Sequence, residues 1–399
     1  MNVAEQIVAQ LVDAGVHRIY GIVGDSLNPI VDAVRKTRGS AKGGIDWIHV
    51  RHEEAAAFAA SAEAQLTGKL AVCAGSCGPG NLHLINGLYD ANRTGAPVLA
   101  IASHIPSVQI GSTYFQETHP DRVFEECSVY NELISSAAQS PRTVNSAIRH
   151  AVGLGGVAVI TLPGDITDLK AVEHVPTYAP ARPATLTPNP ADIDEAAALL
   201  NKADKVAIFA GAGVEGAHDE VIALADALKA PIGHSLRGKH FIQYDNPFDV
   251  GMTGLLGYGA AAEGMNDADV LILLGTDFPY DQFLPDTPTI QVDTHAEKLG
   301  RRTDVGLAIH AQVKPFIEAL LPHLRAGRSD SFLKAKIKKH AEIMHAPVGA
   351  YTRNVEKMRP IHPEYAAHLL NETAAKDAIV TADTGMCNVW TARYIDPLG

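Results

Sequence analysis

The stretch VRHEEAAAFAASAEAQLTGKLAVCAGSCGPGNLHLINGLYDA, residues 50–91, decides the fold. Residues 53–66 are alanine-rich and end at Gly68, which predicts a helix, and residues 81–92 predict a second helix. Between them, residues 70–74 are apolar and predict a buried strand. Strands that alternate with helices predict a parallel sheet covered on both faces, because parallel strands need crossover connections.

The same alternation continues on both sides of this stretch. Further strands are predicted at 17–23, 46–50, 97–103 and 157–162. A second series has predicted strands at 205–211, 231–235, 269–275 and 288–293, and predicted helices at 218–229 and 313–324. The sequence therefore predicts an α/β protein with doubly wound parallel-sheet domains in tandem.

Prolines indicate the boundary between the domains. The segment EHVPTYAPARPATLTPNPAD holds five prolines and no periodic apolar pattern, which is typical of an extended linker. We expect a first domain at 1–175, a linker at 176–192, a second domain at 193–328, and a further linker with the start of a third domain at 329–399. This last part holds a helical segment in a lysine-rich stretch, a predicted helix that begins near Ile361 and a predicted strand at 378–382. Because these cannot bury their own faces, we expect most of the third domain to be missing from the chain.

Composition and charge exclude several classes of protein. The 399 residues include 33 Lys and Arg against 45 Asp and Glu, a net charge of −12. Nucleic-acid-binding proteins normally carry a basic surplus, so we expect no nucleic-acid partner. Four cysteines are too few for a disulfide framework, and we find neither a signal-peptide pattern nor an apolar run of about 18 residues. These features predict a cytoplasmic protein.

Two features of residues 50–91 bear on chemistry. Glu53 follows a predicted strand and begins a helix, where a carboxylate is favoured by the helix dipole whatever else it does. Open α/β sheets also bind ligands beyond the carboxyl ends of their strands, so Glu53 is a candidate site residue. The turn formed by Gly75 and residues 78–80 (Gly, Pro, Gly) either is a tight turn or lets a ligand approach the backbone. It lacks the lysine of a P-loop.

Several ordered motifs carry a family resemblance. They are RHEEAAAF at 51–58, AVCAGSCGPGNLHLINGLYDA at 71–91, PVLAIASHIPS at 97–107 and GSTYFQETHP at 111–120. This series resembles the pyrimidine-binding domain of thiamine-diphosphate enzymes of the pyruvate oxidase and acetolactate synthase group. Within that group it is most similar to the quinone-dependent pyruvate oxidases, also called pyruvate dehydrogenase (quinone).

The resemblance implies roles for residues of the first domain. Glu53 would hydrogen-bond the pyrimidine ring of thiamine diphosphate, which stabilises the tautomer that the cofactor needs to act as its own base. Phe115 and Gln116 would border the reacting carbon, at a site shared with a neighbouring subunit. Gly78, Pro79 and Gly80 would approach the cofactor or pack at the subunit interface.

The second domain contains the pattern G-x-G-x-x-G at 211–216. No acidic residue ends the next predicted strand, 231–235, where the ribose of NAD would need one, so this dinucleotide motif is a weak match. The resemblance implies FAD instead. The flavin-binding residues that it implies are Arg237, Gly251, Met252, Thr253, Gly254, Leu274, Gly275, Thr276, Asp277, Phe278 and Asp293.

We expect no metal ligands among the site residues of this chain. Cys73 and Cys77 do not form a C-x-x-C pair, and the eighteen histidines do not cluster along the sequence. In the family, the third domain carries a Gly-Asp-Gly motif that holds Mg²⁺ for the diphosphate, and no such sequence occurs here. The chain alone is therefore expected not to bind thiamine diphosphate productively, while FAD retention stays open.

The resemblance implies oxidative decarboxylation of pyruvate to acetate and carbon dioxide, with electrons passing through FAD to a quinone. It implies a homo-oligomer, a dimer or a tetramer, and membrane contact only through a C-terminal region that this chain lacks. This activity is expected to be impaired in the chain as given. Two alternatives stay open: a carboligase of the acetolactate synthase type, and a catalytically silent module for flavin binding or oligomerisation.

Overall fold

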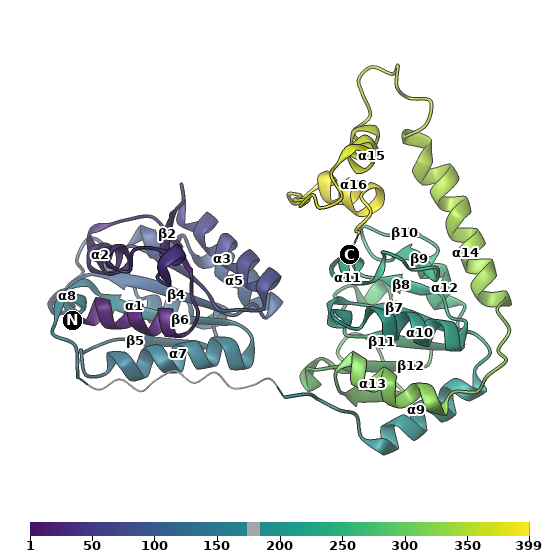
Figure 1. The fold of residues 1–399 in the computed structure, drawn as a ribbon, viewed down its shortest axis with the longest axis horizontal. Coiled ribbons are helices and arrows are strands. Elements are labelled where there is room, and N and C mark those ends of the chain that lie inside the picture. Colours follow the sequence, from purple (N-terminus) through teal and green to yellow (C-terminus); the bar gives the residue numbers. More distant parts are fainter. Residues whose placement is uncertain (174–183, 399) are drawn as a thin grey trace. The chain divides into compact units, whose positions relative to one another are not determined.

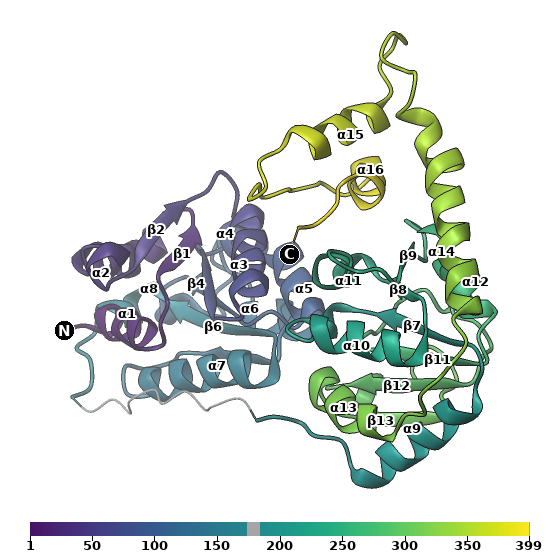
Figure 2. The ribbon, with the colours of Figure 1, turned by 45° about the vertical axis from the view of Figure 1, so that its right-hand side comes forward.

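The computed structural model describes residues 1–173 and 184–398. The chain forms two compact units, Met1–Pro183 and Ala184–Gly399. In each unit a sheet lies between layers of helices, as Figures 1 and 2 show. The predicted fold class, tandem α/β domains with parallel sheets, is confirmed.

The sheet of unit 1 is parallel throughout its described strands. Their order across the sheet is β2-β1-β3-β4-β6-β5. The strands are β1 (Arg18–Gly21), β2 (Asp46–His49), β3 (Ala71–Gly75), β4 (Val98–His104), β5 (Tyr130–Leu133) and β6 (Val157–Pro163). Strand β3 and strand β4 are buried along their whole length, as expected of a sheet covered on both faces.

Helices cover both faces of this sheet. One hydrophobic core contains the apolar residues of α1 (Val3–Asp13), α2 (Asn28–Lys36) and α7 (Ser140–Leu154). A second core, on the other face, contains those of α3 (Glu53–Thr67) and α5 (Ile85–Thr94). Short helices α4 (Pro79–Leu82), α6 (Pro120–Val123) and α8 (Gly164–Asp168) follow strands or turns. The helix predicted at 81–92 is thus two helices, and β5 and α7 were not predicted.

The sheet of unit 2 has the order β10-β9-β8-β7-β11-β12-β13 in the described residues. All of its pairs are parallel except β9 with β10. The strands are β7 (Val206–Ala210), β8 (Ile232–His234), β9 (Asp249–Met252), β10 (Tyr258–Gly259), β11 (Val270–Leu274), β12 (Thr289–Asp293) and β13 (Leu307–His310). One face packs against α9 (Pro190–Lys202), α10 (His218–Leu228), α11 (Leu236–Ile242) and α13 (Val313–Leu320).

The segment that follows α13 is part of unit 2. It forms α14 (Ser331–Ile343), a π-helical turn (Met344–Val348), α15 (Pro363–Thr373) and α16 (Met386–Tyr394). Helix α14 packs near α12 (Ala261–Asn266), β9 and β10, and Tyr394 Oη donates a hydrogen bond of 3.0 Å to the carbonyl of Val348. The expectation that this segment begins a third domain stays a prediction.

Two boundary predictions differ from the structure. The strand predicted at 378–382 is wrong: these residues pair with no described strand, and Ile379 is 90% exposed. An isolated strand has no partner for its backbone hydrogen bonds, so its apolar pattern alone does not stabilise it. The predicted linker 176–192 overlaps α9, which begins at Pro190, where proline is favoured in the first helical turn. Residues 174–183 of that linker lie outside the described residues.

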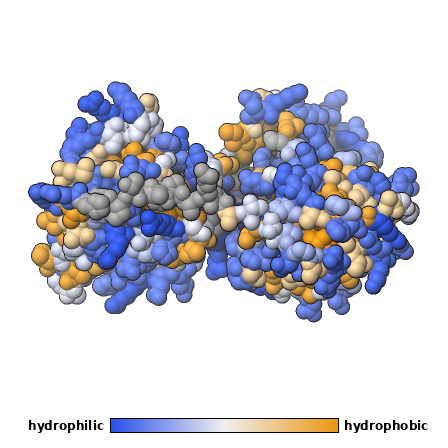
Figure 3. Space-filling view, turned by 60° about the horizontal axis from the view of Figure 1, so that its bottom comes forward, coloured by the Kyte–Doolittle hydropathy of each residue, from blue (hydrophilic) through white to orange (hydrophobic). Residues whose placement is uncertain are grey.

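Within residues 1–173 and 184–398, no helix combines the length and the apolar character that a membrane span requires. On the face drawn in Figure 3, hydrophobic residues are scattered among hydrophilic ones on both units.

The close packing between α3 and α5 predicts how substitutions of glycine change the stability of unit 1. A Cβ atom on Gly87 of α5 would lie 2.5 Å from Ala57 Cβ and 2.6 Å from Phe58 N. We therefore expect Gly87→Ala to destabilise unit 1 by roughly 1–3 kcal/mol through overpacking. Gly153 of α7 has no heavy atom within 4 Å of such a Cβ, so Gly153→Ala should stabilise by about 0.5–1 kcal/mol. Calorimetric unfolding of both variants checks this, and equal effects would refute it.

Candidate functional site

The site in unit 1 lies at the topological switch point of the sheet, where the strands that follow β1 in sequence are added on opposite sides of it. Strand β1 pairs with β2 on one side and with β3 on the other. Ligands of doubly wound sheets bind beyond the carboxyl ends of the strands at such a switch point. Helix α3, with Glu53 as its first residue, follows β2, and the glycine turn follows β3. The fold therefore brings both features of the predicted site to one edge of the sheet.

Glu53 is a buried carboxylate with an imidazole partner. The residue is 7% exposed, and its Oε2 lies 3.2 Å from His83 Nδ1. The preceding residue, His52, caps α3 by accepting a hydrogen bond of 3.2 Å from Glu54 N at its Nδ1. Glu54 Oε1 instead accepts a hydrogen bond from the Asn86 side chain, at 2.6 Å and near the surface. Of the two neighbouring glutamates, Glu53 is the one held toward the interior.

Glycine at position 80 keeps the space beside this carboxylate free. A Cβ atom there would lie 3.2 Å from Glu53 Oε1 and 3.1 Å from Ser76 Cβ. A side chain at position 75 is excluded more strongly, since a Cβ atom on Gly75 would lie 2.5 Å from the Gly80 carbonyl oxygen. Gly78 has φ +70°, a left-handed conformation that glycine tolerates best, and it precedes Pro79 at the start of α4. The turn therefore needs glycine both for its own conformation and for the room next to Glu53.

The loop with Phe115 and Gln116 reaches the same turn. A Cβ atom on Gly78 would lie 3.1 Å from Gln116 Cβ, so these two residues are neighbours. Phe115 is 81% exposed and stacks at a tilt on Tyr114, with ring centroids 4.8 Å apart. The Glu117 carboxylate holds this loop together by accepting hydrogen bonds from Gly111 N at 2.5 Å and from Tyr114 N at 3.2 Å.

Buried and half-buried polar side chains that the sequence analysis missed connect the strand ends. Ser26 Oγ lies 3.0 Å from Ser76 Oγ and accepts a hydrogen bond of 2.9 Å from Cys77 N. Ser103 Oγ donates to the Ser26 carbonyl at 2.8 Å, and Asn81 Nδ2 donates to the Ser103 carbonyl at 2.8 Å. These bonds fix the glycine turn to the ends of β1 and β4. An asparagine directly after a glycine turn is the sequence signal that could have pointed to this network.

The fold also brings two histidines to Glu53. One ligand atom from each of His52, Glu53 and His83 lies within 4.8 Å of the others. The sequence analysis did not place these two histidines together. Spacing along the chain does not reveal it, because His83 reaches Glu53 from the other side of the glycine turn.

The switch point of unit 2 lies between β7 and β11. Strand β7 pairs with β8 on one side and with β11 on the other, and the G-x-G-x-x-G turn follows β7. Gly213 N donates a hydrogen bond of 2.9 Å to the Gly275 carbonyl, and a Cβ on Gly213 would lie 2.6 Å from Gly275 Cα. The glycines of this motif thus allow two strand-end turns to pack backbone against backbone.

The predicted flavin residues occupy varied surroundings at this edge of the sheet. Asp277 forms ion pairs with Arg301 and Arg302, each with its Nε 3.3 Å from Asp277 Oδ1. Asp293 is buried at the end of β12 and accepts a hydrogen bond of 2.9 Å from His295 N. The others are placed as follows: Leu274 ends β11, Gly275 and Thr276 follow it, Phe278 packs edge-on against Phe209, and Arg237 is exposed on α11.

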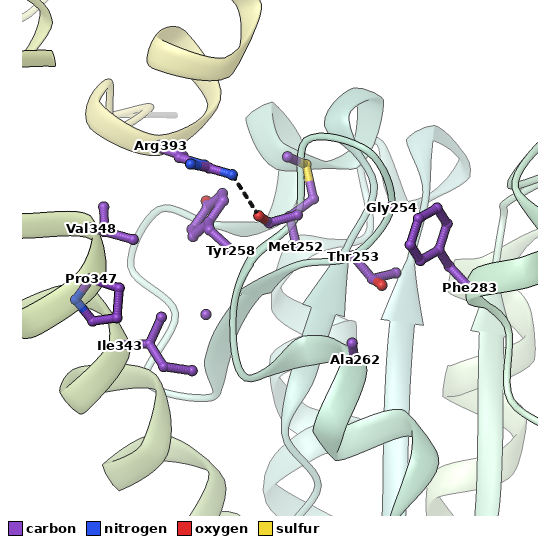
Figure 4. Close-up of a pocket in the computed structure, with 12 residues that line it drawn as sticks. Met252, Thr253, Gly254, Tyr258, Ala262, Phe283, Ile343, Pro347, Val348 and Arg393 are labelled. Atoms are coloured by element: carbon purple, nitrogen blue, oxygen red, sulfur yellow. Dashed lines mark hydrogen bonds between the residues drawn. The ribbon is translucent and has the colours of Figure 1, made fainter.

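A cavity of about 400 Å³ adjoins the turn from Met252 to Gly254. Figure 4 shows it between the β9–β10 turn, the π-helical turn and α16. Apolar side chains form much of its wall, among them Ile343, Pro347 and Val348. Arg393 Nη2 donates a hydrogen bond of 3.1 Å to the Gly257 carbonyl at its edge. The volume falls in the lower part of the range of small-molecule sites, about 300–1,000 Å³.

A buried polar cluster lies behind Tyr258, one of the residues that line the cavity. Lys239 Nζ is 3.5 Å from Tyr258 Oη and also contacts the Gln243 side chain. Burial lowers the pKa of Lys239 to about 8. Nearby, His234 Nε2 lies 3.5 Å from Asp249 Oδ1, and burial lowers the pKa of this histidine and raises the pKa of Asp249. These groups form the most deeply buried ionisable cluster next to the cavity among the described residues.

Comparison with known proteins identifies the family. Residues 1–123 match the family described as "Thiamine pyrophosphate enzyme, N-terminal TPP binding domain", and residues 193–320 match "Thiamine pyrophosphate enzyme, central domain". The chain is 37% identical over 395 residues to the putative thiamine pyrophosphate-containing protein YdaP of Bacillus subtilis, covering 98% of this chain and 67% of YdaP. The chain belongs to the thiamine pyrophosphate enzyme family.

Further relatives show the range of this thiamine pyrophosphate enzyme family. An uncharacterized 42.6 kDa protein of Pseudomonas amyloderamosa is 54% identical over 337 residues, 84% of each chain. The pyruvate oxidase of Lactiplantibacillus plantarum is 31% identical over 392 residues, 96% of this chain and 63% of that enzyme. Acetolactate synthase large subunits match at 27–29% identity. The chain thus spans about two thirds of the length of the pyruvate oxidase and of YdaP.

The surroundings of Glu53 fit the pyrimidine half of thiamine diphosphate. A ring nitrogen that must share a proton needs a carboxylate shielded from water, and Glu53 is 7% exposed. Glycine at position 80 also keeps a side chain out of the position 3.2 Å from Glu53 Oε1, where a Cβ atom would otherwise crowd the carboxylate. For a flavin, the fit rests on the switch point between β7 and β11 and on the cavity at residues 252–254.

The burial of Lys239 predicts how the free energy of unfolding depends on pH. Between pH 8 and pH 10.5 the unfolded chain holds a proton on this lysine that the folded chain has lost, so folding becomes more favourable as the pH rises. The free energy of unfolding should therefore rise with pH in this window for the wild type relative to Lys239→Met, by at most about 3 kcal/mol. Exposed Lys376→Met is the matched control and should show no such trend. Urea unfolding at several pH values measures both differences, and parallel curves for Lys239→Met and the wild type would refute the prediction.

Proposed function

We propose that this chain supplies the pyrimidine-binding and flavin-binding units of a thiamine-diphosphate-dependent pyruvate oxidase. In the proposed reaction, pyruvate and water give acetate, carbon dioxide, two protons and two electrons, and the electrons pass through FAD to a quinone. The pyruvate oxidase among the relatives, at 31% identity over 96% of the chain, supports this choice of substrate.

The observation that carries the proposal is the buried carboxylate of Glu53 at the switch point of unit 1. In the proposed site the Glu53 carboxylate shares a proton with the pyrimidine ring nitrogen. His83 orients this carboxylate through its Nδ1, which lies 3.2 Å from Glu53 Oε2. Thiamine diphosphate, when bound, supplies the stabilisation of negative charge that decarboxylation requires. Gln116, next to Gly78, and the exposed Phe115 would lie over the substrate and limit its contact with water.

For unit 2 we propose FAD binding at the edge where β7, β8, β9 and β11 end. The turn from Met252 to Gly254 and residues 274–278 would hold the cofactor, and exposed Arg237 would offer its charge to the diphosphate. The cavity of about 400 Å³ has the size for a ring system rather than for a whole dinucleotide. Magnesium and the diphosphate of thiamine diphosphate would be held by residues other than these, and a homo-oligomer would complete the site.

An acetolactate synthase-type carboligase is the second candidate. It is supported by the acetolactate synthase relatives, whose identity of 27–29% is close to the 31% of the pyruvate oxidase. Both reactions would use Glu53 in the same way. They differ in whether electrons leave the site, so the products decide between them.

A product assay tests the proposal. The protein isolated from its own source, with any chain that copurifies, is supplied with pyruvate, thiamine diphosphate, Mg²⁺, FAD and a dye that accepts electrons. Acetate formed together with reduced dye is the expected result. Acetolactate without dye reduction would establish the carboligase, and FAD binding without any turnover of pyruvate would establish a silent flavin module.

Substitution of Glu53 tests the role of the carboxylate. Glu53→Gln should lower pyruvate turnover by about 100-fold or more, because an amide cannot hold the shared proton. FAD binding should not change, since the flavin residues belong to the other unit. Glu54→Gln is the matched control, because Glu54 is hydrogen-bonded to Asn86 near the surface. Equal turnover by the Glu53 variant and the wild type would remove Glu53 from the mechanism.

A further inference from the structure

Three side chains with metal-binding atoms meet at the start of α3. His52 and Glu53 are adjacent in sequence, and His83 joins them from the segment between α4 and α5. One ligand atom from each of the three lies within 4.8 Å of the others. This is the one such group of three among residues 1–173 and 184–398.

The distances suit shared coordination of one ion. His83 Nδ1 and Glu53 Oε2 are 3.2 Å apart, close to the separation of about 3.3 Å between two tetrahedral ligands at zinc bond lengths of about 2.0 Å. The rings of His52 and His83 are stacked with centroids 4.4 Å apart and an interplanar angle of 28°. His52 Nδ1 accepts a hydrogen bond of 3.2 Å from Glu54 N, which coordination through this nitrogen would replace.

The surroundings let an ion enter without opening the core. The side chains of His52 and His83 are 50% and 45% exposed, whereas that of Glu53 is 10% exposed. An ion held by the three would therefore have a buried carboxylate on one side and solvent on the other. Three protein ligands leave at least one coordination position for water or for a small ligand.

We infer that His52, Glu53 and His83 form a binding site for a divalent transition-metal ion of the zinc class. Two imidazoles and one carboxylate suit Zn²⁺, Co²⁺, Ni²⁺ and Cu²⁺, whereas Mg²⁺ prefers oxygen ligands only. The site is therefore distinct from the magnesium that the proposed function places at the diphosphate. An ion bound here would occupy the carboxylate of Glu53 and keep it from the pyrimidine ring. This consequence for catalysis rests on the proposed function.

Titration of the untagged chain with Zn²⁺ by calorimetry, without any cofactor, tests the site. We expect one ion per chain, with affinity at least about tenfold weaker in His52→Asn and in His83→Asn, since each loses one of three ligands. Co²⁺ should give the intense visible absorption of a four- or five-coordinate ion in the wild type only. A large excess of Mg²⁺ should not displace either ion.

His49→Asn is the matched control, because His49 is an exposed histidine at the end of β2 outside the group. It should bind Zn²⁺ as the wild type does. Circular dichroism and melting curves verify that the His52 and His83 variants are folded. We expect both to fold, because the two side chains are half-exposed and contribute little to the core. Zinc affinity that is unchanged in the double variant His52→Asn/His83→Asn, or no binding by the wild type, would overturn the inference. Either result would leave the proposed function standing, because the titration contains no thiamine diphosphate.

Discussion

Parallel pairing of β1 with both β2 and β3 is the constraint on which the site of unit 1 depends. Gly21 of β1 is in register with His49 of β2 and with Ala74 of β3. Because the three strands run in the same direction, the residues that follow them emerge at one edge of the sheet. Glu53 and the glycine turn at 75–80 therefore meet there although a whole helix separates them in sequence. The same rule places the turns after β7 and β11 together in unit 2, where Gly213 packs on Gly275.

Burial beside an imidazole gives Glu53 its chemical interest. A carboxylate removed from water must be compensated, and the compensation here is one imidazole at 3.2 Å rather than a fixed cation. The oxygen atoms of Glu53 are hydrogen-bond acceptors and candidate metal ligands. The proposed pyrimidine contact and the inferred metal site are two uses of this one carboxylate.

The sequence predicted much of the fold from local pattern. Apolar runs such as 71–75 and 270–274 and helices ended by glycine, such as the one that Gly68 ends, are recognisable because their periodicity is local. Elements whose stability comes from tertiary partners were predicted poorly. The apolar residues 378–382 find no neighbouring strand and form none, whereas α7, with its polar exposed face, forms because one side packs into the core of unit 1.

By itself the sequence determined the alternation of many strands and helices, the two family domains and Glu53 as the first candidate, because these follow from residues close together in the chain. Only the tertiary structure decided that Glu53 is buried, that His52 and His83 accompany it, and that Lys239 lies dehydrated behind the cavity. Contacts of this kind join residues from separate elements. They arise when strands pair and helices pack, so no pattern along the chain records them.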